Sequence, residues 1–468
     1  MEIQFFGAAQ TVTGSMHVVR TPEATVLLEC GLYQGRRGDA YQKNKNLPFR
    51  PRDIDVCVLS HAHIDHSGLL PMLHKNGFTG EVFCTPATRD LCAAMLEDAA
   101  MIQAQDARYL NRKIEEGEAF GEPIEPLYDV DDVVKLLEHM VPIPYHRKTK
   151  IAPGVELTYL DAGHVLGSAI VVLDVDDVGA HRRVVFSGDL GRRNMPILRD
   201  PEIPSGAHFL IMESTYGDRE HDPIERMDDA LAEVIERTHG RGGKVVIPSF
   251  ALERAQEIVF ALKRLQTAGR LPANLRVYVD SPLTVRLTDV FRMHPDCYDA
   301  EMREMLRQGE SPFDFPGLTY TSSVEESKAI STSDEPAVII SASGMCESGR
   351  IIHHLKSIIE SKKHTVLIVG WQAQHTLGRR LVEKRLRVPI FGVERDRLCE
   401  VVVLNGFSAH ADRSDLIDFA EAVRERGSLR RVALVHGEPV SQRALQADLE
   451  ARGFTEVKAP APGETMPV

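Results

Sequence analysis

The chain has 468 residues, 43% of them hydrophobic and 26% charged, with a formal net charge of −13. This composition is typical of two or three globular domains; it argues against a disordered or fibrous protein, and the acidic balance alone argues mildly against a nucleic-acid partner. Because the sequence has no apolar run of about 18 residues, no signal-like N-terminus and seven scattered cysteines without a CxxC motif, we expect a cytoplasmic protein with no membrane partner.

Short β-rich apolar runs alternate with helical stretches, which is an α/β pattern. Many runs are continuous in Val, Ile and Leu, as expected of strands covered on both faces. The clearest predicted strands, in chain order, are 3–8, 25–30, 55–60, 169–175, 183–187, 209–213, 244–249, 276–280, 337–343, 365–370, 400–405 and 431–436.

Polar residues with metal-binding or catalytic chemistry stand at the ends of several of these strands. His61, Asp189, Asp280 and His436 are examples. Because ligand sites in α/β sheets gather outside the carboxyl ends of strands, we expect several strand ends to converge on one site.

The densest signal is the turn HAHIDH at 61–66, directly after the strand 55–60. His61 and His63 can address one cation, while Asp65 and His66 can address a second about 3.5–4 Å away. Imidazole and carboxylate ligands without a thiolate suit Zn²⁺ better than Mn²⁺ or Fe²⁺. The turn therefore predicts a metal site.

Two later turns supply further candidate ligands. His164 in Asp-Ala-Gly-His would complete a three-imidazole site with His61 and His63. Asp189 ends a strand in Phe-Ser-Gly-Asp, where one carboxylate could bridge two cations.

Together these turns resemble the metallo-β-lactamase superfamily. The motifs ESTYG (213–217), SAHAD (408–412) and VHGE (435–438) are similar to those of its β-CASP branch, which includes the nuclease subunit of the cleavage and polyadenylation machinery and its prokaryotic relatives. The resemblance runs essentially end to end, with supporting strings QG (34–35), PSF (248–250), RAQE (254–257), DSPL (280–283), SGM (343–345) and GR (349–350).

The resemblance implies an α/β fold, a four-layer αββα metallo-β-lactamase sandwich with an inserted α/β β-CASP domain. We expect residues 1–207 to form the first part of the metallo-β-lactamase domain, 208–388 the insert, and 389–468 the second part. Asp189 and His436 are 247 positions apart, which agrees with an insert on spacing alone.

The resemblance also implies two Zn²⁺ per chain. One would take His61, His63 and His164; the other would take Asp65, His66 and His436, with Asp189 bridging. The implied catalytic residues are Asp65, His410 as proton donor, and Glu213, which would orient His410.

The implied function is zinc-dependent hydrolysis of RNA phosphodiester bonds by a two-metal hydroxide mechanism, leaving 5′-phosphate and 3′-OH ends. An endonuclease is expected, with 5′→3′ exonuclease activity left open. In this family a histidine at the position of His436 goes with RNA. Two alternatives are a non-catalytic RNA-processing partner subunit and a glyoxalase II-like small-molecule hydrolase.

For the substrate we expect single-stranded RNA held through its backbone phosphates, and a homodimer is left open. Trp371 is the sole tryptophan and is expected in the core, so no base-stacking platform is predicted. The predicted substrate-binding residues are Arg254, Gln256, Ser343, Gly344, Gly349, Arg350 and Arg379.

The sequence departs from the family pattern at two places. Glu29 stands where the family usually has Asp, so we expect a shifted contact behind the metal loop. Gln374 and His375 stand where the family usually has Glu-Gly.

Overall fold

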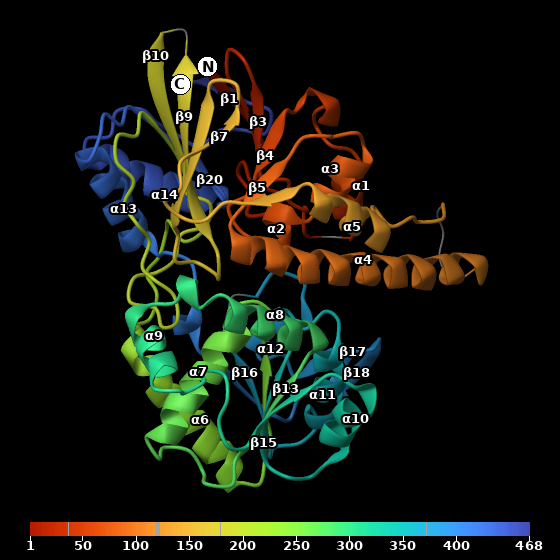
Figure 1. Cartoon of the computed structure of the whole chain (residues 1–468). Helices are drawn as coiled ribbons and strands as arrows, with labels where there is room; N and C mark the ends of the chain where they lie inside the picture. Colours follow the sequence, from red (N-terminus) through yellow and green to blue (C-terminus); the bar gives the residue numbers. More distant parts are fainter. Residues whose placement is uncertain (36, 118–121, 178, 371) are drawn as a thin grey trace. The chain divides into compact units, whose positions relative to one another are not determined.

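The computed structural model describes residues 1–35, 37–117, 122–177, 179–370 and 372–468; Trp371 lies outside them. The chain forms two compact units, coloured along the sequence in Figure 1. Unit 1 consists of Met1–Asn194, Arg199–Glu220 and His410–Val468, and unit 2 of Met195–Leu198 and His221–Ala409.

Unit 1 is built on two mixed sheets of seven strands each. The first has the order β22-β1-β2-β3-β4-β5-β6, antiparallel from β22 to β3 and parallel from β3 to β6. Its strands are β1 (Glu2–Gly7), β2 (Met16–Arg20), β3 (Thr25–Leu28), β4 (Val56–Val58), β5 (Val82–Cys84), β6 (Met140–Pro142) and β22 (Thr465–Pro467).

The second sheet has the order β21-β20-β11-β10-β9-β8-β7, antiparallel from β7 to β10 and parallel beyond. Val, Ile, Leu and Phe side chains from both sheets share one buried core, so the sheets pack face to face. The strands of the second sheet are β7 (Thr149–Ala152), β8 (Val155–Asp161), β9 (Ala169–Asp177), β10 (Ala180–Phe186), β11 (Phe209–Glu213), β20 (Arg431–Val435) and β21 (Val457–Lys458).

Helices cover the outer faces of both sheets. In Figure 1, α3, α4 and α5 lie beside the first sheet, and α13 and α14 lie beside the second, where they share a second core with it. This confirms the predicted αββα sandwich. The helices of unit 1 are α1 (Arg37–Lys45), η1 (Pro51–Asp53), α2 (Ile64–Ser67), α3 (Leu70–Lys75), α4 (Pro86–Glu115), α5 (Val130–Glu138), α13 (Arg413–Glu425) and α14 (Pro439–Ala451).

Unit 2 contains a six-stranded parallel sheet of order β14-β13-β15-β12-β16-β19. Continuous Val/Ile runs make β12 and β15 buried along their whole length, as parallel strands between helices should be. The strands are β12 (Val245–Pro248), β13 (Arg276–Asp280), β14 (Leu318–Thr321), β15 (Ala337–Ser341), β16 (Thr365–Ile368) and β19 (Glu400–Val403), with a separate hairpin of β17 (Arg387–Ile390) and β18 (Val393–Asp396).

The helices of unit 2 connect these strands. They are η2 (Ile224–Arg226), α6 (Met227–Gly240), α7 (Arg254–Thr267), α8 (Pro282–Met293), η3 (Pro295–Cys297), α9 (Ala300–Arg307), α10 (Val324–Thr332), α11 (Arg350–Ile358), α12 (Leu377–Val382) and η4 (Asn405–Phe407). Within the described residues, none of the helices is both long and apolar enough to cross a bilayer.

Candidate metal centre

The turn predicted to bind metal lies between β4 and α3. His61 and His63 occupy the loop, and Asp65 and His66 lie on the short helix α2. Close backbone packing fixes the turn: a Cβ on Gly31 would lie 1.6 Å from the carbonyl oxygen of Asp65, so only glycine fits at that position.

Three further strand ends bring the remaining predicted ligand residues to this turn. His164 follows β8, Asp189 follows β10, and His436 follows β20. The second sheet therefore supplies three of the seven residues, and the loop after β4 in the first sheet supplies the others.

One group comprises His61, His63, His164 and Asp189, whose ligand-type atoms all lie within 4.8 Å of one another. The Nε2 atoms of His61 and His164 lie 3.1 Å and 3.4 Å from Nδ1 of His63. Each of these two Nε2 atoms is 3.6 Å from Oδ2 of Asp189.

The other group comprises Asp65, His66 and His436. Nε2 of His436 is 3.2 Å from Nε2 of His66 and 3.5 Å from Oδ2 of Asp65. Asp189 faces this group as well, with Oδ2 3.3 Å from His66 Nε2 and Oδ1 3.4 Å from His436 Nδ1. One carboxylate is therefore shared by two clusters.

The donor set fits divalent cations. Burial lowers the pKa of His61 and His164 well below its usual value, so both imidazoles are neutral and keep a lone pair for a metal. Burial works against ionisation of Asp189, but the surrounding histidines hold its pKa well below the usual range. Its buried Oδ1 has no hydrogen-bond partner among the described residues. Converging imidazole nitrogens around a shared carboxylate suit Zn²⁺.

Glu29 lies directly behind both clusters. Its carboxylate accepts hydrogen bonds from the Ser60 hydroxyl and from the Ser60 backbone N–H, the latter at 3.2 Å, and it also pairs with Nδ1 of His66. The Ser60 hydroxyl in turn lies 2.9 Å from Nδ1 of His61. The longer side chain at this position thus reaches one histidine directly and a second through a hydroxyl.

Sequence reasoning missed two hydroxyl groups that orient predicted ligands. Ser60 contacts His61 as described, and the Thr215 hydroxyl lies 3.1 Å from Nδ1 of His436. Partners on the second ring nitrogen fix the tautomer of a metal-binding histidine. Ser60 directly precedes the HAHIDH turn, and this position could have predicted its contact with a ligand histidine.

The predicted acid and its partner lie beside the same clusters. Nδ1 of His410 is 3.3 Å from Oε1 of Glu213, which also accepts a hydrogen bond of 2.7 Å from the backbone N–H of Leu190. Burial alone would lower the pKa of His410, but the charge and hydrogen bond of Glu213, with Asp189, raise it to about 8. Asp189, Glu213 and His410 also form a group of ligand-type atoms within 4.8 Å.

The predicted substrate-binding residues all lie in unit 2. Ser343, Gly344 and Gly349 belong to the loop between β15 and α11. Side chains of the other four have intramolecular partners: Arg254 pairs with Glu257, Gln256 donates to Thr288, Arg350 donates to Asp280, and Arg379 pairs with Glu383.

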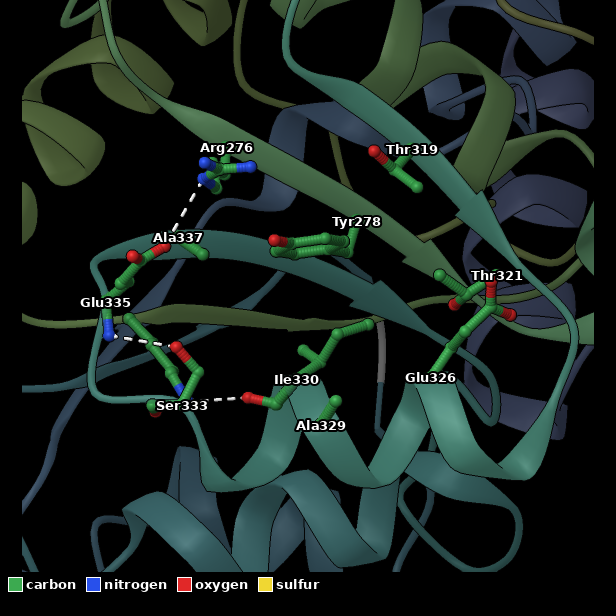
Figure 2. Close-up of a pocket in the computed structure, with 11 residues that line it drawn as sticks. Arg276, Tyr278, Thr319, Thr321, Glu326, Ala329, Ile330, Ser333, Glu335 and Ala337 are labelled. Carbon is green, nitrogen blue, oxygen red and sulfur yellow. Dashed lines mark hydrogen bonds and ion pairs between the residues drawn. The ribbon is translucent and has the colours of Figure 1, made fainter.

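A cavity of about 310 Å³ lies elsewhere in unit 2, between α10 and the strands β13 and β14. Figure 2 shows Tyr278 and an ion pair of 3.3 Å between Arg276 and Glu335 among its lining. Lys244, also in the lining, donates to the backbone carbonyls of Ile330 and Ser333. None of the predicted site residues lines this cavity.

Three family models match the chain. They are the Metallo-beta-lactamase superfamily over residues 10–225, the Beta-Casp domain over 255–381, and the Zn-dependent metallo-hydrolase RNA specificity domain over 395–460.

Curated relatives match over most of this chain. A ribonuclease of Thermus thermophilus is 36% identical over 468 residues, covering 100% of both chains. Transcription termination factors FttA of Methanocaldococcus jannaschii and Methanosarcina mazei are each 32% identical, over 94% of this chain and 67% of their own length. A solved protein of unknown function from Enterococcus faecalis, 13% identical with a TM-score of 0.54 and 99% of both chains covered, shares the fold.

Proposed function

From its membership of the metallo-β-lactamase superfamily, in the branch that carries β-CASP and RNA specificity domains, we propose that the chain is an endonuclease for single-stranded RNA. Membership makes it a Zn-dependent metallo-hydrolase. The observation that carries the proposal is the carboxylate of Asp189, shared by two buried clusters and set beside the His410–Glu213 pair.

Two zinc ions per chain would be held by the residues of the two clusters. One set is His61, His63 and His164, the other is Asp65, His66 and His436, and Asp189 would serve both. When bound, such ions supply a nucleophile at neutral pH and neutralise charge on phosphoryl oxygens.

The chain's own residues would complete the hydrolysis. Oxygen from water forms a new bond to phosphorus while the bond from phosphorus to O3′ breaks, so the departing O3′ needs a proton. His410 is placed to donate it, because Glu213 faces Nδ1 and leaves the other ring nitrogen for the substrate. The products are a 5′-phosphate and a 3′-OH.

Glu29, Ser60 and Thr215 would act by position. Ser60 contacts Nδ1 of His61, and Thr215 contacts Nδ1 of His436. Glu29 contacts Nδ1 of His66 and also accepts a hydrogen bond from the Ser60 hydroxyl. These contacts hold the rings in the tautomer that presents the inner nitrogen to a cation.

One relative and one family model support RNA as the substrate. The ribonuclease of Thermus thermophilus matches over the full length, and the RNA specificity model covers 395–460, a segment that includes His410 and His436. An added 5′→3′ exonuclease activity, a homodimer and the domain boundaries 1–207, 208–388 and 389–468 remain proposals.

For the grip on phosphate we propose the loop between β15 and α11. Gly349 is the N-cap of α11 and no side chain caps that helix. The N–H of Ile351 donates to the carbonyl of Ala342 at 3.4 Å, so phosphate would bind the other N–H groups of the first turn, near Ser343 and Gly344. Arg379 would contact phosphate in competition with Glu383, which pairs with it at 2.9 Å. Arg254, Gln256 and Arg350 would need to exchange their intramolecular partners in the same way.

A direct assay separates this function from a small-molecule hydrolase. The zinc-loaded protein is incubated with end-labelled single-stranded RNA and, in parallel, with S-lactoylglutathione, each with and without chelator. The proposal predicts chelator-sensitive cleavage of RNA and no thioester turnover. Thioester turnover without RNA cleavage would refute it.

A further inference from the structure

The parallel sheet of unit 2 has topological switch points on both sides of the β12–β15 pair. The connection from β12 through α7 leads toward β13 while that from β16 leads the other way to β19, and the connection from β13 leads to β14 while that from β15 through α11 leads the other way to β16. In open α/β sheets, ligands bind outside the carboxyl ends of strands whose connections leave in opposite directions. The carboxyl ends of β12 and β15 are therefore the place in this sheet to look for a ligand contact.

An exposed aromatic ring stands at this position. Phe250 follows the last residue of β12 by two positions and is 48% exposed. A Cβ on Gly344, which follows β15, would lie 3.1 Å from Cδ2 and 3.2 Å from Cε2 of Phe250. The ring is therefore braced against a glycine, and a side chain at position 344 would have to displace it.

Two other aromatic side chains are exposed to a similar degree within the described ranges. Tyr109 lies on α4 of unit 1, and Phe391 lies at the turn of the β17–β18 hairpin, where it contacts His353 with ring centroids 4.7 Å apart. Neither stands at the carboxyl end of the parallel sheet. Isolated exposed apolar residues are common on proteins, so exposure alone does not mark a binding residue. Phe250 is distinguished by its position at the carboxyl end of the sheet and by its contact with Gly344.

We propose that the ring of Phe250 is a stacking platform for one base of the bound single-stranded RNA. This inference rests on the proposed function and extends it from phosphate contacts to a base contact. Stacking on an aromatic ring is tolerant of sequence because every base has a flat face. The Ser343–Gly344 backbone beside the ring would hold the phosphate next to that base.

The test measures binding of a labelled single-stranded RNA to the zinc-loaded protein, in the His410→Ala background so that cleavage is slow. We expect Phe250→Ala to weaken binding about tenfold and Phe250→Trp to bind within about twofold of the parent. Phe391→Ala, which removes an aromatic ring of similar exposure from the same unit, is the matched control and should bind normally.

RNAs with a single abasic nucleotide at successive positions locate the stacked base. In the parent protein one position should cost about tenfold in affinity, and Phe250→Ala should remove that dependence. If Phe250→Ala has lost its folded structure by circular dichroism, Phe250→Leu replaces it, because leucine keeps the apolar bulk but lacks a flat ring.

Parent-like binding by Phe250→Ala or Phe250→Leu would overturn the platform and leave the proposed function intact. Failure of the parent protein to bind or cleave RNA at all would instead refute the proposed function, and the platform with it.

Discussion

Replacing His410 with alanine should remove most RNA cleavage while leaving the zinc content unchanged. Loss of a positioned proton donor costs about 10²–10⁴ in rate, which corresponds to about 3–5 kcal/mol of activation free energy. Glu213 raises the pKa of His410 to about 8 against the effect of burial, which favours the protonated ring that this role needs.

Glu213 makes this prediction more specific. The pKa of His410 is raised from 6.5 to about 8 despite burial, chiefly by the charge and hydrogen bond of Glu213 3.3 Å away. A proton donor acts only when protonated, so activity should fall as pH rises through this pKa. Bound cations would offset the charge of Asp189, but not the hydrogen bond to Glu213. Glu213→Gln should therefore move the alkaline limb of kcat/KM to lower pH.

The assay is the initial rate of cleavage of end-labelled single-stranded RNA across pH, with zinc per chain measured on the same samples. His181→Ala is the control, because that histidine is exposed and pairs with Asp174 outside the site. Since Asp189, Glu213 and His410 could themselves form a cation site, a fall in zinc content with His410→Ala would refute the proton-donor role. An alkaline limb unmoved by Glu213→Gln would refute the role of Glu213.

Three further predictions concern other parts of the structure. Glu29→Gln should weaken zinc affinity about 10–100-fold, measured by competition with a chelator, whereas Glu29→Asp should retain most of the affinity. If Glu29→Gln bound zinc as tightly as the parent, the positioning role of Glu29 would be contradicted. Burial raises the pKa of Asp161 to about 7 in the folded chain, against about 3.9 in the unfolded chain. The contribution of Asp161 to the free energy of unfolding is therefore complete below pH 4 and is lost as pH rises to about 7. The loss amounts to at most about 4 kcal/mol. In urea unfolding with chelator, the change in stability between pH 4 and pH 7 should differ between the parent and Asp161→Asn by about this amount. Asp280→Asn should destabilise the chain by about 3–5 kcal/mol, because the fully buried carboxylate partners Arg350 and His354 at 2.6 Å, while exposed Asp289→Asn should change stability by less than about 0.5 kcal/mol.

The strands of the buried sheets were predictable from their apolar runs. All twelve predicted strands coincide with observed ones, because a strand covered on both faces needs uninterrupted apolar residues. Ten other strands of the described residues were not predicted, β2 and β8 of the sandwich among them. β8 (Val155–Asp161) alternates buried and half-buried positions, so its sequence lacks the continuous apolar run. β19 follows the predicted insert 208–388 and pairs with β16 in unit 2, a partnership that no local pattern reveals.

Convergence of the site was also predictable, since polar residues stand at the strand ends of the two packed sheets and meet at one end of the sandwich. The contacts behind them were not. Whether Glu29 reaches Ser60, or Arg350 reaches Asp280, depends on side-chain packing between segments distant in sequence. His375, which stands where the family usually has glycine, has a φ of 72°, so this turn keeps the left-handed conformation that favours glycine.

Cleavage of end-labelled single-stranded RNA by the zinc-loaded protein and by the chelator-stripped protein, with the product ends mapped, tests the central claim most directly. Metal-dependent hydrolysis at the shared carboxylate of Asp189 predicts 5′-phosphate and 3′-OH ends from the loaded protein and no products from the stripped one. Equal rates in the two samples, or 5′-OH ends with cyclic phosphates, would contradict it.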